Sequence, residues 1–385
     1  MWVHTYKTDE DGYLTRCKSR LVVRGDLQKA SSQDTYAATL AARVFRALMA
    51  IAAYFNLDIY QFDAVNAFCN AFLDELVYVR YPDGFQVDGH CLQLIRALYG
   101  LPKSLLLWHN LACKYLDKLG LKPVPDCPCL YTNSKLVVFF YVDDFAVLCH
   151  PNNQSVYQEF RTEFLKAFKM REIGELKWFL GIRVVRDRKV RKLWLCQDSY
   201  ITKISKRFRR TGSAVRSSKT PMAIPPPSPY TRTATNDEIQ LYSQVVGSLT
   251  YPASITRPDI AFCTKCLAQN LKNPGPRHLE AAYQCVNYLE DTKFLALEYG
   301  GDVTSKPVFS ASTDEHQKSH DQDSPPVFMA ASDAAFADDE LTRKSSEGYA
   351  LKLFNGLFDW VSRLQTTVTT STTEAELLAI AHLIS

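Results

Sequence analysis

The chain has 385 residues, 46% of them hydrophobic, and a formal net charge of +4. A chain of this length exceeds what a single hydrophobic core organises, so we expect two or three domains. The small net charge does not decide between nucleic acid and protein as a partner. No apolar run reaches the roughly 20 residues that a membrane-spanning helix needs, which predicts no association with a membrane.

Eleven cysteines are present, but their spacing indicates neither a disulfide framework nor a zinc site. Cys127 and Cys129, like Cys263 and Cys266, have no partner pair at zinc-binding spacing, so we interpret them as buried free thiols. No secretory signal follows the first residue. We therefore expect a reducing, intracellular environment, with the nucleus, the cytoplasm and a virus-like particle all open as locations.

Apolar residues recur at three- and four-residue steps over 44–55, which predicts an amphipathic helix. Asn56 would end this helix, and a short strand would then carry Asp63 at its edge. A second apolar stripe over 108–119 predicts another helix, which Gly120 can terminate.

Two adjacent aspartates, Asp143 and Asp144, interrupt a run of apolar and aromatic residues from Lys135 to Cys149. The β-branched and aromatic residues predict two buried strands, and the aspartates predict a tight two-residue turn between them. Two carboxylates at such a turn repel each other and are costly to desolvate, so we expect a cation to hold them. Oxygen ligands on a short rigid turn suit Mg²⁺. An ordinary surface turn is the alternative, which the flanking strands and a third aspartate disfavour.

Asp63 is that third aspartate. One carboxylate from its strand and two from the turn form a set that clamps two Mg²⁺ ions roughly 3.5–4 Å apart. In such a site one metal activates an attacking hydroxyl and the other stabilises the leaving phosphate. We therefore predict Asp63, Asp143 and Asp144 as catalytic and metal-binding residues, in a pattern that indicates phosphoryl transfer by a polymerase.

Basic residues are concentrated between Arg183 and Lys219. This stretch holds thirteen basic residues against two acids, Asp187 and Asp198, so it carries about +11. A charge density of this kind suits the phosphate backbone of a nucleic acid. A solvated basic face is the alternative, and the neighbouring polymerase-like aspartates favour a segment that follows a duplex.

Tyr141-Val-Asp-Asp144 resembles the active-site motif of reverse transcriptases, and the whole chain resembles the polyprotein of a copia-type long-terminal-repeat retrotransposon. The resemblance covers nearly the whole chain except about 300–327. It rests on an ordered series of blocks, namely Trp2–Lys7, Asp9–Gly12, Arg20–Gly25, Asp63–Phe68, Tyr81–Phe85, Leu98–Leu101, Ile173–Ile182, Val246–Leu249, Thr256–Ala261, Ser332–Ala334, Arg343–Ser345 and Thr373–Glu376. A lone Tyr-x-Asp-Asp would be weak evidence, whereas this series is specific.

The resemblance implies an α+β fold of the right-hand polymerase type, followed by a connection and a partial ribonuclease H-like α/β segment. In chain order it implies reverse-transcriptase fingers and palm at 1–185, a basic thumb segment at 186–220, a Pro-rich linker at 221–235, a connection at 236–299, a disordered insertion at 300–326 and a truncated ribonuclease H-like segment at 327–385. The proline content of the linker predicts a stiff extended tether, and the polar composition of the insertion predicts flexibility.

The resemblance also implies roles for residues outside the aspartates. It implies nucleotide-binding roles for Phe68, Tyr99, Gly100, Lys18, Arg20 and Arg24, and a primer grip at Phe179, Leu180, Gly181 and Ile182. Phe68 would be the aromatic residue that excludes a ribose 2′-hydroxyl, with an ordinary core phenylalanine as the alternative. The three basic residues would lie near the incoming triphosphate.

For the ribonuclease H-like segment, the resemblance implies Asp333 and Glu376 as remaining acidic residues. Glu374 is the alternative to Glu376. Glu376 is favoured because Glu376 and Ala379 keep the family's Glu-x-x-Ala spacing. Because the sequence stops at Ser385, before the family's later acidic positions, we expect no ribonuclease H activity from this chain alone.

The expected function is that of an RNA-directed DNA polymerase with Mg²⁺ as cofactor. Its partners would be an RNA template, a DNA primer, the RNA–DNA hybrid and dNTPs. A catalytically inactive retrotransposon remnant and a module that only binds nucleic acid stay open as alternatives. The run Pro102–Trp108 favours the inactive remnant, because leucines replace the proline and arginine that the family usually has there.

Overall fold

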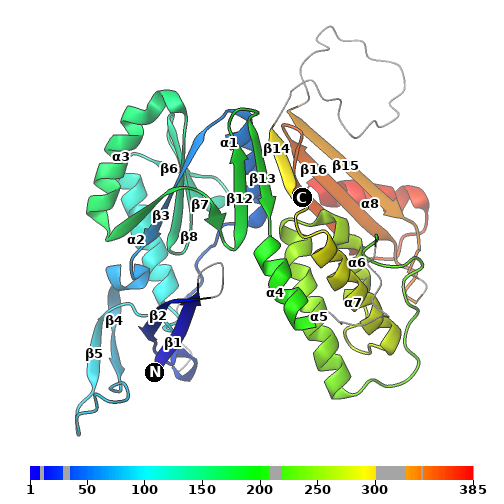
Figure 1. The fold of residues 1–385 in the computed structure, drawn as a ribbon, viewed down its shortest axis with the longest axis horizontal. Helices are drawn as coiled ribbons and strands as arrows, with labels where there is room; N and C mark the ends of the chain where they lie inside the picture. The colour runs from blue at the N-terminus through cyan, green and yellow to red at the C-terminus, as the bar shows by residue number, and fades with distance from the viewer. Residues whose placement is uncertain (9–12, 29–34, 209–218, 301–326, 340, 385) are drawn as a thin grey trace. The chain divides into compact units, whose positions relative to one another are not determined.

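The computed structural model describes residues 1–385 except 9–12, 29–34, 209–218, 301–326, 340 and 385 (Figure 1). The chain forms two compact units: the first contains Met1–Ala41 and Asp58–Leu176, and the second contains Ala42–Leu57 and Lys177–Ser385. These units follow from packing alone, and their bounds are separate from those of the fingers, palm, thumb and connection segments expected from the sequence. The disordered insertion expected at 300–326 lies outside the described residues, apart from Gly300.

A six-stranded antiparallel sheet forms the centre of the first unit. Its strands, in spatial order, are β10 (Met170–Glu175), β3 (Asp58–Ala64), β9 (Asp144–Cys149), β8 (Leu136–Tyr141), β7 (Cys127–Thr132) and β6 (Lys122–Val124). The strands expected on either side of the aspartate pair are β8 and β9. Both are largely buried, as their β-branched and aromatic residues predict.

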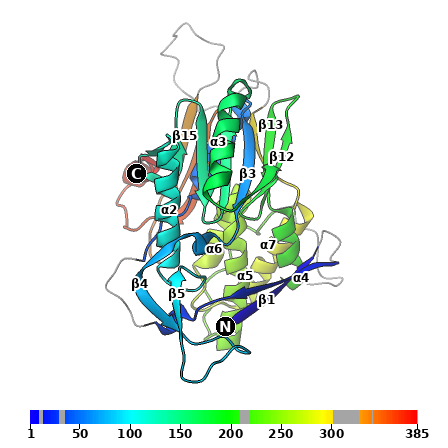
Figure 2. The ribbon, with the colours of Figure 1, turned by 90° about the vertical axis from the view of Figure 1, so that its left-hand side faces the viewer.

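Helices α2 (Ser104–Lys118) and α3 (Gln154–Ala167) pack on one face of this sheet (Figure 2). Phe145 of β9 receives the edges of two aromatic rings, Trp108 from α2 and Phe164 from α3. The helix expected over 108–119 is confirmed, and Gly120 follows it with a φ of 80°.

Two antiparallel hairpins complete the described strands of the first unit. One joins β1 (Trp2–Thr8) to β2 (Leu14–Leu21), and the other joins β4 (Phe72–Val79) to β5 (Leu92–Arg96). Backbone from the end of β2 reaches the region before α2, because the amide of Val23 donates to the carbonyl of Tyr99 at 2.8 Å. This contact brings residues of the β2 strand beside the segment 98–101.

The second unit includes helix α1 (Ala42–Tyr54), which confirms the helix expected over 44–55. A four-stranded antiparallel sheet packs against it, in the order β11 (Trp178–Phe179), β12 (Ile182–Asp187), β13 (Lys192–Cys196) and β14 (Leu297–Gly300). Phe45 of α1 stacks on Phe179 of β11 with ring centroids 4.9 Å apart. Helix α1 is therefore separated in sequence from the segments on which it packs.

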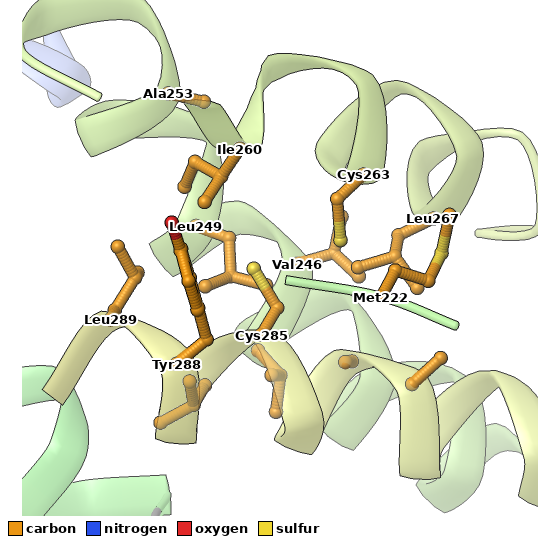
Figure 3. Close-up of a cluster of buried hydrophobic side chains, with 14 of the residues drawn as sticks. Met222, Val246, Leu249, Ala253, Ile260, Cys263, Leu267, Cys285, Tyr288 and Leu289 are labelled. Atoms are coloured by element: carbon orange, nitrogen blue, oxygen red, sulfur yellow. The ribbon is translucent and has the colours of Figure 1, made fainter. Parts of the chain in front are cut away.

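Four helices build a hydrophobic core in the second unit: α4 (Asp198–Phe208), α5 (Asn236–Ile255), α6 (Ala261–Ala268) and α7 (Pro276–Asp291). Figure 3 shows side chains of α5, α6 and α7 converging, among them Val246, Leu249, Cys263, Leu267, Cys285 and Leu289. A capping box at Thr235 and Glu238 begins α5.

The last described segment is an antiparallel meander of β15 (Phe328–Ala335), β16 (Ser346–Leu353) and β17 (Gly356–Leu364), followed by α8 (Thr372–Ile384). Arg46 of α1 is buried and links this meander to α5. Its guanidinium donates to the carbonyls of Phe358 at 2.6 Å and Ser254 at 2.7 Å, and pairs with Asp359 at 3.4 Å. Trp360 packs on the same guanidinium, 4.1 Å from ring centroid to Cζ.

All eleven cysteines are free thiols. Cys129, Cys263 and Cys266 are buried as expected, whereas Cys127 is only partly buried because it lies at the start of β7. Within the described ranges, no helix is both long enough and apolar enough to span a bilayer.

Candidate active site

Asp63 and Asp144 lie directly opposite each other on the adjacent strands β3 and β9. Their sequence neighbours, Phe62 and Phe145, form the next pair of the register and contact α3 through Phe164. Because successive side chains of a strand point to opposite faces, both aspartates lie on the sheet face away from α2 and α3. The strand pairing thus places two of the three predicted carboxylates together.

Asp143 lies in the turn that joins β8 to β9. The sequence predicted a turn made of the two aspartates, and the structure corrects that position: the two-residue turn is Val142–Asp143, and Asp144 is the first residue of β9. The reason is that pairing continues to Tyr141 opposite Asp144, which leaves only two residues to reverse the chain. The carbonyl of Asp143 accepts a hydrogen bond of 2.8 Å from the amide of Ala64. The turn residue Asp143 is therefore hydrogen-bonded to the residue that follows Asp63 on β3.

The three carboxylates perturb one another. Burial raises the pKa of Asp144 to about 6, and repulsion from Asp143 and Asp63 adds to this effect. Burial also raises the pKa of Asp143, with a further contribution from Asp63. Gln61, two residues before Asp63 on the same strand face, hydrogen-bonds the Asp144 carboxylate and partly offsets the rise in its pKa. Sequence reasoning missed Gln61, although its two-residue spacing from Asp63 is the signal that would identify it.

Arg171 of β10 forms an ion pair with Asp63, with 3.1 Å between guanidinium nitrogen and carboxylate oxygen. The two residues are cross-strand partners. In the part of the chain that the structure describes, no three acidic, histidine or cysteine side chains are placed closely enough to hold a metal ion. The orientation of Asp63 toward Arg171 is consistent with this, because it directs that carboxylate to another cation.

The donor set itself fits Mg²⁺. Asp63, Asp143 and Asp144 offer only oxygen ligands, and burial and repulsion disfavour their charged forms unless a cation neutralises them. The residues therefore match the chemistry of the expected cofactor.

Lys18 and Arg20 lie close enough to Asp143 for their charges to act on it. Both charges lower the pKa of Asp143 against the opposing effect of burial. The guanidinium of Arg20 also lies over the ring of Tyr99, 5.6 Å from its centroid. Arg24 differs from these two, because it forms a bidentate, exposed ion pair with Asp26. The structure therefore brings two of the three predicted basic residues to the carboxylates.

Tyr99 and Phe68 contact each other at the same place. Their rings meet edge-on with centroids 4.6 Å apart, and Phe68 lies on the short helix η2 (Ala67–Asn70), which follows Asp63 on the chain. Burial raises the pKa of the Tyr99 phenol, and the nearby Asp143 raises it further. The Tyr99–Phe68 pair thus lies close enough to Asp143 and Asp63 for their charges to act on the Tyr99 phenol.

Gly100 and Gly25 allow two backbone segments to cross there. Gly100 has a φ of 94°, and a Cβ on it would lie 2.0 Å from the carbonyl oxygen of Val23. A Cβ on Gly25 would lie 1.9 Å from the carbonyl oxygen of Gly100. Neither residue can carry a side chain without moving the backbone, so both glycines hold the β2 side of the site against Tyr99.

Phe179, Leu180, Gly181 and Ile182 belong to the second unit and form a tight hairpin. Phe179 pairs with Ile182, and the two residues between them both have positive φ, 51° for Leu180 and 75° for Gly181. Tyr251 of α5 donates its hydroxyl to the carbonyl of Leu180 at 2.7 Å. The predicted primer grip is therefore a turn whose backbone is fixed from α5.

Asp333 and Glu376 also lie in the second unit, on β15 and α8. The Glu376 carboxylate accepts from the amide of Ala334, adjacent to Asp333, at 3.3 Å. Glu374 instead accepts from the amide and hydroxyl of Thr370, at 2.6 and 2.8 Å, at the start of α8. The geometry favours Glu376 over Glu374 as the neighbour of Asp333.

The basic stretch 183–219 is not a single solvated segment. Its described part spans β12, β13 and α4, while 209–218 lies outside the described residues. Arg183 pairs with Asp198 at 2.9 Å, Lys192 pairs with Glu298 at 2.7 Å, and Arg186 donates to the carbonyl of Leu57. Several of its charges are thus used within the second unit.

Comparison with known proteins identifies the family of these residues. A family described as "Reverse transcriptase (RNA-dependent DNA polymerase)" matches residues 1–224. The chain is 31% identical over 395 residues to the retrovirus-related Pol polyprotein from transposon TNT 1-94 of Nicotiana tabacum, covering 98% of the chain and 28% of that protein. It is 29% identical over 394 residues to the corresponding polyprotein from transposon RE1 of Arabidopsis thaliana, covering 99% of the chain and 25% of that protein. The chain thus spans about a quarter of the length of these curated relatives.

Proposed function

Because the chain belongs to the reverse transcriptase (RNA-dependent DNA polymerase) family, we propose that it extends a DNA primer on an RNA template. The substrates are dNTPs, and the product bond forms between the primer 3′-hydroxyl and the α-phosphate of the dNTP. Relatives over nearly the whole chain are Pol polyproteins of transposons. The proposal therefore describes a polymerase module of a copia-type retrotransposon.

One observation carries this proposal: Asp63 and Asp144 are cross-strand partners on β3 and β9, and Asp143 lies in the adjoining β8–β9 turn. These residues would hold Mg²⁺, which when bound supplies charge stabilisation for the attacking and leaving oxygens in a two-metal arrangement. The raised pKa of Asp144 supports this role, because burial, and then repulsion from Asp143 and Asp63, disfavours its charged form unless a cation neutralises it.

The residues around the carboxylates supply binding and selection. Lys18 and Arg20 would bind the triphosphate, since their positive charges already act on Asp143. Phe68, held edge-on by Tyr99, would lie under the sugar and exclude a 2′-hydroxyl. Gly100 would support the nucleotide site indirectly, because its close crossing with the Val23 backbone holds the neighbouring Tyr99 in place. Arg24 has a weaker place in this scheme because Asp26 already pairs with it.

Primer and duplex contacts are assigned to the second unit. The turn from Phe179 to Ile182 would orient the primer 3′-hydroxyl through its backbone, which Tyr251 fixes at Leu180. The basic residues of β12, β13 and α4 would bind the phosphates of the hybrid.

The test is primer extension on poly-rA primed with oligo-dT, in the presence of dTTP and Mg²⁺. We expect extension by the wild-type chain and a loss of at least a hundredfold in Asp143→Asn. Asp117→Asn is the matched control, because Asp117 lies on α2 in an exposed ion pair with Lys122. No extension by folded wild-type protein, with salt-sensitive binding of the hybrid retained, would replace the proposal with a nucleic-acid-binding module.

A further inference from the structure

Val142, the residue before the candidate catalytic Asp143, has a backbone conformation that its side chain disfavours. Its φ is 56°, in the left-handed region. A two-residue hairpin turn with positive φ at its first position normally has glycine there, and a β-branched residue in this region is a clear outlier. The conformation is strained for a β-branched residue, so other contacts must hold the turn.

Trp108 of α2 makes such a contact. Its indole Nε1 donates a hydrogen bond of 2.6 Å to the carbonyl oxygen of Val142. The indole is completely buried, and its ring meets Phe145 and Phe168 edge-on at 6.3 and 5.1 Å. Because these contacts fix the orientation of the ring, its N–H is directed at the carbonyl of Val142.

The two peptide groups of the turn are therefore held from different elements. Trp108 on α2 binds the carbonyl of Val142, and Ala64 on β3 binds the carbonyl of Asp143 at 2.8 Å. The strain at Val142 relaxes only if its φ changes, and rotation about its N–Cα bond would move the carbonyl of Val142 away from Trp108 and the Asp143 backbone away from Ala64. The Trp108 bond opposes this rotation directly.

We propose that Trp108 is a positioning residue for Asp143, and that its indole N–H keeps the Val142–Asp143 turn in the strained conformation that aims the carboxylate. The Trp108 indole contacts Val142, Phe145 and Phe168. The inference rests on the proposed polymerase function for its consequence in catalysis. The geometry of the turn does not depend on that function.

The test variant is Trp108→Phe, which removes the N–H and keeps an aromatic ring in the pocket. We expect kcat for primer extension to fall roughly ten- to hundredfold, since a small misplacement of a reacting group has that effect, while KM for dTTP changes little. Trp360→Phe is the matched control: it removes a buried indole hydrogen bond of 2.8 Å to Ala253 in the second unit. Trp360→Phe should lower the thermal stability about as much as Trp108→Phe does, and it should leave kcat unchanged.

A second substitution separates positioning from packing. Glycine takes positive φ without cost, so Val142→Gly in the Trp108→Phe background should restore most of the lost kcat. Failure of this rescue would overturn the proposal, because the loss would then come from the ring's packing. Wild-type kcat in Trp108→Phe itself would also overturn it.

Hydrogen exchange of the Ala64 amide gives a readout that does not need activity. In Trp108→Phe this amide should exchange at least tenfold faster, because its acceptor on Asp143 is no longer held, while Trp360→Phe should leave it unchanged. If the wild-type chain does not extend primers, the proposed function fails and this measurement still decides the inference. Unchanged exchange at Ala64, or an equal increase throughout the first unit, would refute the positioning role.

Discussion

Asp63 and Asp144 are cross-strand partners at one end of the central sheet, so the register of β3 and β9 places two negative charges side by side. Directly opposed like charges destabilise a sheet, and Asp143 in the adjoining turn adds a third. A fold that retains such an arrangement is less stable than one with neutral residues there. The arrangement makes sense if a cation is part of the working protein.

Asp144→Asn should therefore stabilise the metal-free protein. The pKa of Asp144 is raised from 3.8 to about 6, which corresponds to at most about 3 kcal/mol, and solvent screening at this partly open site lowers that to about 1 kcal/mol. We expect Tm to rise by about 2–4 °C at pH 7 without divalent metal, together with loss of primer extension. Asp117→Asn, on an exposed helix position, should change stability by less than about 0.5 kcal/mol.

The same site gives the stability a defined pH dependence. Because the folded-state pKa of Asp144 lies above its unfolded value, the native state binds more protons between about pH 4 and 6. The free energy of unfolding contributed by this group is thus fully present below pH 4 and is lost as the pH rises through 6. Denaturant titrations in EDTA should show this decline in wild type and a flatter profile in Asp144→Asn. A wild-type profile identical to that of the variant would contradict the assignment.

Gly100 should be essential to the first unit for a steric reason. In Gly100→Ala the new Cβ would lie 2.0 Å from the Val23 carbonyl at a φ of 94°, and we expect a loss of about 2–4 kcal/mol. Gly84→Ala separates strain from crowding, because Gly84 has a φ of 87° with nothing within 4 Å of an added Cβ. That control should lose only about 1 kcal/mol. Equal losses in urea unfolding would show that the crossing with Val23 is not tight.

Local patterns predicted the elements that carry the site. The apolar stripes over 44–55 and 108–119 became α1 and α2, and the apolar runs around the aspartates became β8 and β9. Each of these signals is contained within fewer than about 20 residues, where periodicity is directly visible. Asp143 and Asp144 are close to each other because they are consecutive in the chain.

Contacts set by strand order were not predictable in this way. Arg171 faces Asp63 only because β10 pairs with β3, and the two residues are 108 positions apart in the chain. The stripe that includes Trp108 correctly predicted a buried ring, but periodicity reports burial and not the direction of an indole N–H. The exact turn was also missed, since one extra pair at Tyr141 and Asp144 moves it by a residue.

Phe68 should control the choice between deoxyribonucleotides and ribonucleotides. Phe68→Val removes the ring that Tyr99 holds edge-on at 4.6 Å, so incorporation of rUTP relative to dTTP should rise on the order of tenfold or more. Phe72→Val is the matched control, because Phe72 lies on β4 with 62% of its surface exposed. The measurement is the ratio of kcat/KM for the two nucleotides. A ratio that shifts equally in both variants would remove Phe68 from its role as the gate.

Arg46 should be the main polar link between α1 and the β15–β17 meander in the second unit. Arg46→Met leaves the Asp359 carboxylate and the carbonyls of Phe358 and Ser254 without this donor. Loss of one partner of a buried pair typically costs about 3–5 kcal/mol, and we expect that loss in urea unfolding. Arg183→Met removes an exposed ion pair with Asp198 instead and should cost less than about 1 kcal/mol.

Limited proteolysis can locate the effect of Arg46→Met. Because Arg46 contacts both α5 and β17, the variant should be cleaved faster within 346–364 as well as next to α1. Arg183→Met should keep the wild-type cleavage pattern. If Arg46→Met resists proteolysis as well as wild type and unfolds at the same urea concentration, the helix is held by its apolar contacts alone, such as Phe45 on Phe179. The buried guanidinium would then contribute no net stability. Some buried ion pairs can likewise be replaced by well-packed apolar side chains without loss of stability.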